Sequence, residues 1–130
     1  MTNMKSTKAD LGRIFRAVGY SIQGLRAAWQ HEAAFRQEVY ALAVLAPATL
    51  ALGLPALHTV VLLALMGAVL ATELVNSAIE AIVDKTSPEK HELAGRAKDC
   101  GSAAVLVVVL VLTGAWLTLA GPAAWRLIAG

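Results

Sequence analysis

The chain has 130 residues, of which 58% are hydrophobic and 15% charged, and its formal net charge is +2. With a mean hydropathy of +0.64, this composition is too apolar for a soluble domain of this size and predicts an integral membrane protein. The single cysteine, Cys100, excludes an internal disulfide, and we expect it to have a packing role.

The N-terminal 30 residues hold scattered basic side chains and no compact apolar core, which argues against a cleavable signal peptide. Over residues 11–29 the apolar side chains share one arc of a helical wheel, and Arg13, Arg16 and Tyr20 face the other way. This pattern predicts an amphipathic helix over about residues 8–30, lying on the membrane surface with its arginines near lipid head groups. Three glycines within it leave a bend or break as an alternative.

Three apolar stretches follow, and each is long enough to cross a bilayer. We expect spans over about residues 35–57, 59–84 and 99–125. A shift in the apolar phase predicts a change of chain direction near residues 30–34. Gly53 and Pro55 indicate a very short turn after the first span, so the first two spans should be antiparallel neighbours.

The basic residues predict the orientation of these spans. Ten of the eleven precede the first span or lie between the second and third, and Arg126 is the exception. The positive-inside rule then places the N-terminus in the cytoplasm and the C-terminus outside. Small residues at 101–104 predict that the third span is buried in protein at its start, and Trp116 and Trp125 suit the outer interface. We expect residues 1–130 to form a single multi-pass domain.

The second span carries a stripe of polar side chains. Spacings of three, four and four residues place Glu73, Asn76, Glu80 and Asp84 on one face of a helix. An acid inside a span costs about 2.5 to 3.5 kcal/mol on insertion scales, so such acids usually have a function. Two alternatives remain open: a polar seam that joins helices, and the lining of a small cation or proton channel.

The stripe suits phosphoryl transfer. Glu73 and Glu80 lie about 10 Å apart along a helix axis, so we expect them to have different roles. Glu73, the deeper acid, is suited to accept a proton from a hydroxyl at the membrane boundary. Glu80, near Asn76 and Asp84, is suited to hold a divalent cation such as Mg²⁺, and Lys98 offers a phosphate partner. No Walker motif or kinase glycine loop occurs in the sequence.

Three strings carry a family resemblance: AAWQHEAAFRQE (27–38), ELVNSAIEAIVD (73–84) and HELAGRAKDCGSAAV (91–105). The chain resembles the bacterial integral-membrane diacylglycerol kinases over roughly residues 11–120. The resemblance implies ATP-dependent phosphorylation of diacylglycerol to phosphatidic acid at the bacterial inner membrane, in phospholipid recycling. It also implies an all-α homotrimer with three transmembrane helices and one surface helix per chain, and active sites between chains. An undecaprenol kinase of the same fold is the nearest alternative, and no nucleic-acid partner is expected.

The resemblance also implies roles for individual residues. Glu73 would be the catalytic base, and Glu32 and Glu80 would bind the Mg²⁺ that accompanies ATP. The residues implied to contact ATP are Arg13, Tyr20, Glu32, Glu80, Glu89, His91, Lys98 and Asp99. The residues implied near the lipid substrate are Arg13, Trp29, Glu73 and Ser102, and those implied to support the site are Asn76, Glu38 and Asp84. The chain departs from the usual family pattern at Val18, Pro47 and Pro55.

Overall fold

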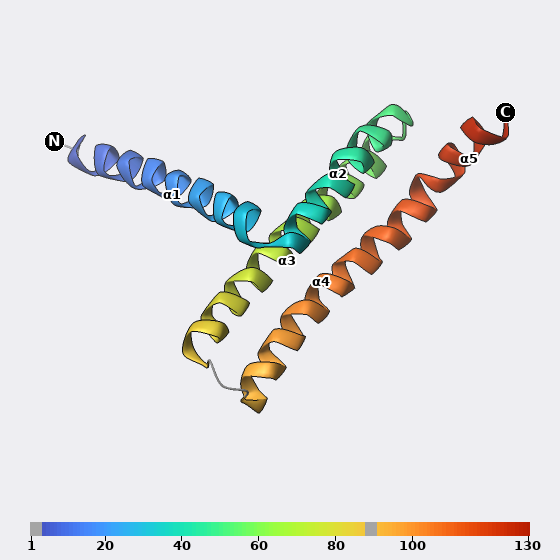
Figure 1. The fold of residues 1–130 in the computed structure, drawn as a ribbon. Helices are drawn as coiled ribbons and strands as arrows, with labels where there is room; N and C mark the ends of the chain where they lie inside the picture. The colour runs from blue at the N-terminus through green and yellow to red at the C-terminus, as the bar shows by residue number, and fades with distance from the viewer. Residues whose placement is uncertain (1–3, 88–90) are drawn as a thin grey trace.

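The structure is a computed structural model that describes residues 4–87 and 91–130. Over these residues the regular structure is entirely helical, which confirms the all-α expectation. The helices are α1 (Met4–His31), α2 (Ala33–Ala51), α3 (Ala56–Thr86), α4 (Glu92–Leu119) and α5 (Gly121–Ala129). Helices α2 and α4 both pack along α3, and α1 leaves this bundle at a steep angle (Figure 1).

Helix α1 is continuous, so the glycines within it introduce no break. It packs on α2 and α3 through its C-terminal part, and its N-terminal part projects away from the bundle (Figure 1). Its apolar side chains stay exposed within the chain, Phe15 by 74% and Ile14 by 57%. An apolar arc of this kind without a protein partner is the pattern expected of a helix on a membrane surface.

The corner between α1 and α2 lies at Glu32, whose backbone is extended (φ −106°, ψ 110°). Arg36 stabilises it, because its Nη1 donates to the carbonyls of Trp29 (2.8 Å) and Gln30 (3.4 Å), which end α1 without helical partners. The Trp29 and Tyr40 rings also meet edge to face, with centroids 5.6 Å apart. The change of direction expected near residues 30–34 is therefore confirmed.

Among the described residues, α3 and α4 are long and apolar enough to cross a membrane. Helix α2 has 19 residues with Pro47 inside it, and its length of about 28 Å is close to the thickness of a hydrocarbon core. It ends at Ala51, and α3 begins at Ala56 after a short turn. Gly53 has φ +61° in this turn, a conformation that side-chain-bearing residues rarely adopt.

The buried apolar core lies where α2, α3 and α4 pack together, around Leu62, Met66, Val69, Leu112 and Ala120. Trp116 packs against this core, and its Nε1 donates to Thr49 Oγ1 at 3.0 Å, which links α4 to α2. The sequence suggests an interfacial place for Trp116, but the structure turns its polar end inward because Thr49, fully buried, offers an acceptor. Trp125 is 69% exposed.

The segment expected as the third span, residues 99–125, is divided in the structure. Helix α4 ends at Leu119, and α5 starts at Gly121 with a proline in its first turn. Pro122 has no backbone N–H, and its ring crowds the carbonyl four residues earlier, which disfavours an unbroken helix at this point. The apolar pattern alone does not reveal this break, because α5 is as apolar as the helix before it.

Candidate active site

The polar stripe occupies the second half of α3 and turns from buried to exposed along its length. Glu73 is 4% exposed and Asn76 7%, Glu80 is half-buried, and Asp84 is exposed. The expectation that these side chains share one face and that the deeper acid points inward is confirmed. The polar face of α3 therefore runs from the buried carboxylate of Glu73 to the exposed carboxylate of Asp84.

The position of Glu73 along α3 is informative. It lies seventeen residues after Ala56, which corresponds to about 26 Å of helix, and Glu80 lies about 36 Å from the same point. A hydrocarbon core is about 30 Å thick. If α3 enters this core at Ala56, Glu73 lies just inside the far boundary and Glu80 lies beyond it, near head groups and water.

Two further acids approach the stripe from other elements. Glu38 of α2 is close enough to Glu73 for their charges to interact, and Glu73 interacts in the same way with Glu80 and with Glu32 at the α1–α2 corner. We call these four side chains the acidic centre. One Glu38 oxygen, Oε2, is buried and has no hydrogen-bond partner among the described residues. Acids from the α1–α2 corner, from α2 and from α3 itself thus lie near Glu73.

Asn76 organises one side of the acidic centre. Its Nδ2 donates to Glu80 Oε1 at 3.3 Å, one helical turn further along α3. Its Oδ1 is buried and, like the hydroxyl of Ser77, lacks a hydrogen-bond partner within the described residues. These atoms are available to a ligand or to weaker contacts.

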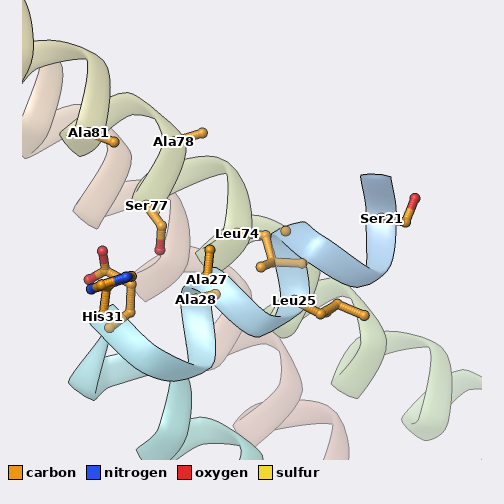
Figure 2. Close-up of a pocket in the computed structure, with 11 residues that line it drawn as sticks. Ser21, Leu25, Ala27, Ala28, His31, Leu74, Ser77, Ala78 and Ala81 are labelled. Carbon is orange, nitrogen blue, oxygen red and sulfur yellow. The ribbon is translucent and has the colours of Figure 1, made fainter. Parts of the chain in front are cut away.

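A cavity of about 640 Å³ lies between α1 and α3 beside the acidic centre. It is lined by Ser21, Gly24, Leu25, Ala27, Ala28, His31, Glu32, Leu74, Ser77, Ala78 and Ala81. Figure 2 shows Ser77 and His31 near one end of this cavity, and Ser21 and Leu25 toward the other. Its walls are mostly small and apolar, and their polar members are Ser21, His31, Glu32 and Ser77. Such a cavity suits an amphipathic ligand.

The residues at the start of α4 form a separate polar group. Lys98 Nζ lies 2.9 Å from Asp84 Oδ1, and this hydrogen bond raises the pKa of Lys98, so the ammonium stays charged. His91 caps α4, because its Nδ1 accepts from the Leu93 N–H at 3.2 Å. Asp99 is exposed. Glu89, also expected near ATP, lies outside the described residues.

Arg13 and Tyr20 of α1 are expected at the site but lie away from the acidic centre. Arg13 and Tyr20 line a groove on the part of α1 that projects from the bundle (Figure 1). Ser102 is exposed on α4, as is Cys100, so of the segment 101–104 only Gly101 is buried within the chain. One chain therefore assembles the acids and Asn76, but it does not bring Arg13 and Tyr20 to them.

Two residues shape this site without a sequence signal for that role. Arg36, one of the basic residues near the first span, fixes the corner that carries Glu32. Gly101, one of the small residues at 101–104, is the position where α4 approaches Asn76 directly. The family string around residues 91–105 marks the region, but no local signal singles out Gly101.

The fold and the site define a helical membrane protein with a buried acidic centre near one end of its spans. The family model described as prokaryotic diacylglycerol kinase matches residues 19–120. The chain is 46% identical over 116 residues to a diacylglycerol kinase of Escherichia coli strain K12, covering 89% of this chain and 95% of the relative. It is 45% identical over 112 residues to one from Pseudomonas aeruginosa (86% and 91% covered) and 39% over 106 residues to one from Haemophilus influenzae (82% and 90%).

The chain therefore belongs to the prokaryotic diacylglycerol kinase family. This confirms the family expected from the three strings, and with it the expectation of a membrane-bound kinase.

Proposed function

We propose that this chain transfers the γ-phosphoryl group of ATP to the hydroxyl of diacylglycerol, giving phosphatidic acid and ADP, at the cytoplasmic face of the bacterial inner membrane. The observation that carries the proposal is Glu73, a buried carboxylate about 26 Å along α3 from its first residue. A lipid alcohol anchored by its acyl chains presents its hydroxyl near the same depth. The names of the relatives supply the lipid class.

Glu73 is the catalytic base in this mechanism. Its carboxylate accepts the proton of the lipid hydroxyl as that oxygen attacks the γ-phosphorus in line, and the bond to the ADP oxygen breaks. The surrounding helices shield Glu73 from bulk water, so the proton is drawn from the substrate. The cavity beside Glu32 and Ser77 offers an apolar entry for the lipid from α1, and Trp29 and Ser102 are assigned to the same substrate.

Mg²⁺ accompanies ATP in this proposal, held by Glu32 and Glu80. The described residues contain no cluster of three or more His, Cys, Asp or Glu side chains arranged for a metal. Mg²⁺ bound with a nucleotide usually takes one or two carboxylates together with phosphate oxygens and water, and Glu32 and Glu80 would supply the two carboxylates. When bound, the ion neutralises charge on the phosphates. Asn76 orients Glu80 through its 3.3 Å hydrogen bond.

ATP is assigned to the polar group at the start of α4 and to the projecting part of α1. Lys98, charged and partly exposed beside Asp84, can exchange that partner for a phosphate, and His91 and Asp99 lie at the same end of α4. Glu89, outside the described residues, is assigned to ATP with them. Arg13 and Tyr20 complete the nucleotide contacts. Because α1 projects away from its own bundle (Figure 1), we assign its groove to the acidic centre of another chain.

This geometry supports a homotrimer with sites between chains, the number three coming from the family resemblance. We also assign α2 as a membrane span, since its length of about 28 Å nearly matches the hydrocarbon core. With α1 on the cytoplasmic surface, three spans place the C-terminus outside. Glu38, which α2 brings to Glu73, then lies near the cytoplasmic boundary as a supporting residue.

Transfer of labelled phosphate from ATP to a panel of lipid alcohols, with and without Mg²⁺, tests the proposal. We expect labelled phosphatidic acid from diacylglycerol, strict dependence on Mg²⁺, and far less product from undecaprenol. Undecaprenol as the preferred acceptor would refute the substrate assignment. Ion flux in liposomes without ATP consumption or lipid phosphorylation would refute the kinase proposal and favour a channel.

A further inference from the structure

Helix α4 passes against Asn76 at Gly101. A Cβ atom built on Gly101 would overlap Asn76 Oδ1, and it would lie 3.3 Å from Cγ and 3.8 Å from Cα of the same residue. Where contacts with the described residues are concerned, Gly101 is the one glycine of the ten whose added side chain would meet a residue of another helix. The contact is therefore specific to this position and needs a residue without a side chain.

The same geometry gives Asn76 Oδ1 a neighbour. The hydrogen that glycine carries in the Cβ direction points at this oxygen, which is the arrangement of a weak Cα–H···O contact between packed helices. Oδ1 is buried and has no conventional hydrogen-bond partner among the described residues. At the other end of the amide, Nδ2 donates to Glu80 Oε1. The amide plane is thus held between the backbone of α4 and a carboxylate of the acidic centre.

We infer that Gly101 is a positioning residue: it lets the backbone of α4 fix the amide of Asn76, which in turn orients the Glu80 carboxylate. The inference rests on the proposed function, in which Glu80 serves the nucleotide side of the site. An alanine at position 101 forces the amide to rotate or α3 and α4 to separate, and either change weakens the hydrogen bond to Glu80. Gly101 itself touches neither substrate.

The first test compares Gly101→Ala with Gly114→Ala. Gly114 lies on the same helix, and a Cβ there meets no heavy atom within 4 Å in the described chain, so it controls for adding a methyl group to α4. We expect Gly101→Ala to lower kcat/KM for ATP by about 10- to 100-fold, mainly through KM, as loss of an orienting partner does. Gly114→Ala should match the unchanged protein. A Gly101→Ala protein with reduced kcat but unchanged KM would overturn the inference, because a general packing defect lowers only the amount of competent enzyme.

A double-mutant cycle on thermal unfolding in detergent, without nucleotide, tests the contact itself. Gly101→Ala alone should lower Tm, because its Cβ strikes the Asn76 amide. Asn76→Ala removes those atoms, so the double variant should have the same Tm as Asn76→Ala alone. Additive Tm losses would overturn the inference. If Gly101→Ala alone does not fold, a folded double variant supports the inference and an unfolded one refutes it.

The two sets of measurements separate this inference from the proposed function. The unfolding cycle needs no substrate. A chain that phosphorylates no lipid alcohol but shows non-additive Tm losses would refute the kinase proposal and retain the Gly101–Asn76 contact. A fully active chain whose variants show additive Tm losses would refute the Gly101–Asn76 contact and leave the kinase proposal standing.

Discussion

Replacing Glu73 by glutamine tests the proposed chemistry most directly. The side chain is 4% exposed, and glutamine has almost the same shape, so the packing of α3 against its neighbours should survive. The amide, however, cannot accept the hydroxyl proton. Loss of a general base typically costs 10² to 10⁴ in rate, which corresponds to about 2.7 to 5.4 kcal/mol in transition-state stabilisation.

The structure also predicts what should not change. The charge of Glu73 interacts with the like charges of the other three acids of the acidic centre, so removing it reduces the repulsion between them. We expect the Tm of Glu73→Gln in detergent to equal or exceed that of the unchanged protein. KM for ATP should stay within a few-fold, because the nucleotide contacts are assigned to other residues.

The assay is labelled-phosphate transfer to diacylglycerol in mixed micelles, with kcat and both KM values measured. Glu92→Gln, at an exposed acid in the first turn of α4, is the matched control and should keep the normal rate. A folded Glu73→Gln protein with near-normal kcat would show that Glu73 is not the base. A large loss in Glu92→Gln would mean that surface charge, and not base chemistry, governs the rate.

Trp116→Phe removes the hydrogen bond to Thr49, so the free energy of unfolding should fall by about 0.5 to 1.5 kcal/mol, with unchanged kcat. The control, Trp125→Phe at an exposed site, should leave Tm unaltered. Equal Tm values for the two variants would contradict the α2–α4 link. Lys98→Ala should raise KM for ATP at least tenfold, and an unchanged KM would remove Lys98 from the nucleotide site. Asp84→Asn should barely change Tm, because its ion pair with Lys98 is exposed. Chelation of Mg²⁺ should abolish phosphate transfer and readdition should restore it, and activity that persists in excess chelator would refute the metal assignment.

Much of the architecture could be predicted from the sequence because the signals are local. Hydropathy and length indicate apolar helices, and the spacing of Glu73, Asn76 and Glu80 places them on one helical face wherever that helix packs. The corner at Glu32 and the short turn at Gly53 also follow from nearby residues. The break at Pro122 is equally local, but the uninterrupted apolar run through it predicts one span.

Other features depend on contacts between distant segments, which periodicity does not encode. The approach of Glu38 and Glu32 to Glu73 depends on how α2 and the α1–α2 corner pack on α3. The inward turn of Trp116 depends on Thr49, 67 residues earlier in the chain. The sequence by itself determined which helices form and which face of α3 is polar, because both follow from the geometry of a single helix. Only the tertiary structure decided which acids surround Glu73 and that Gly101 holds Asn76, because those depend on the register in which helices pack.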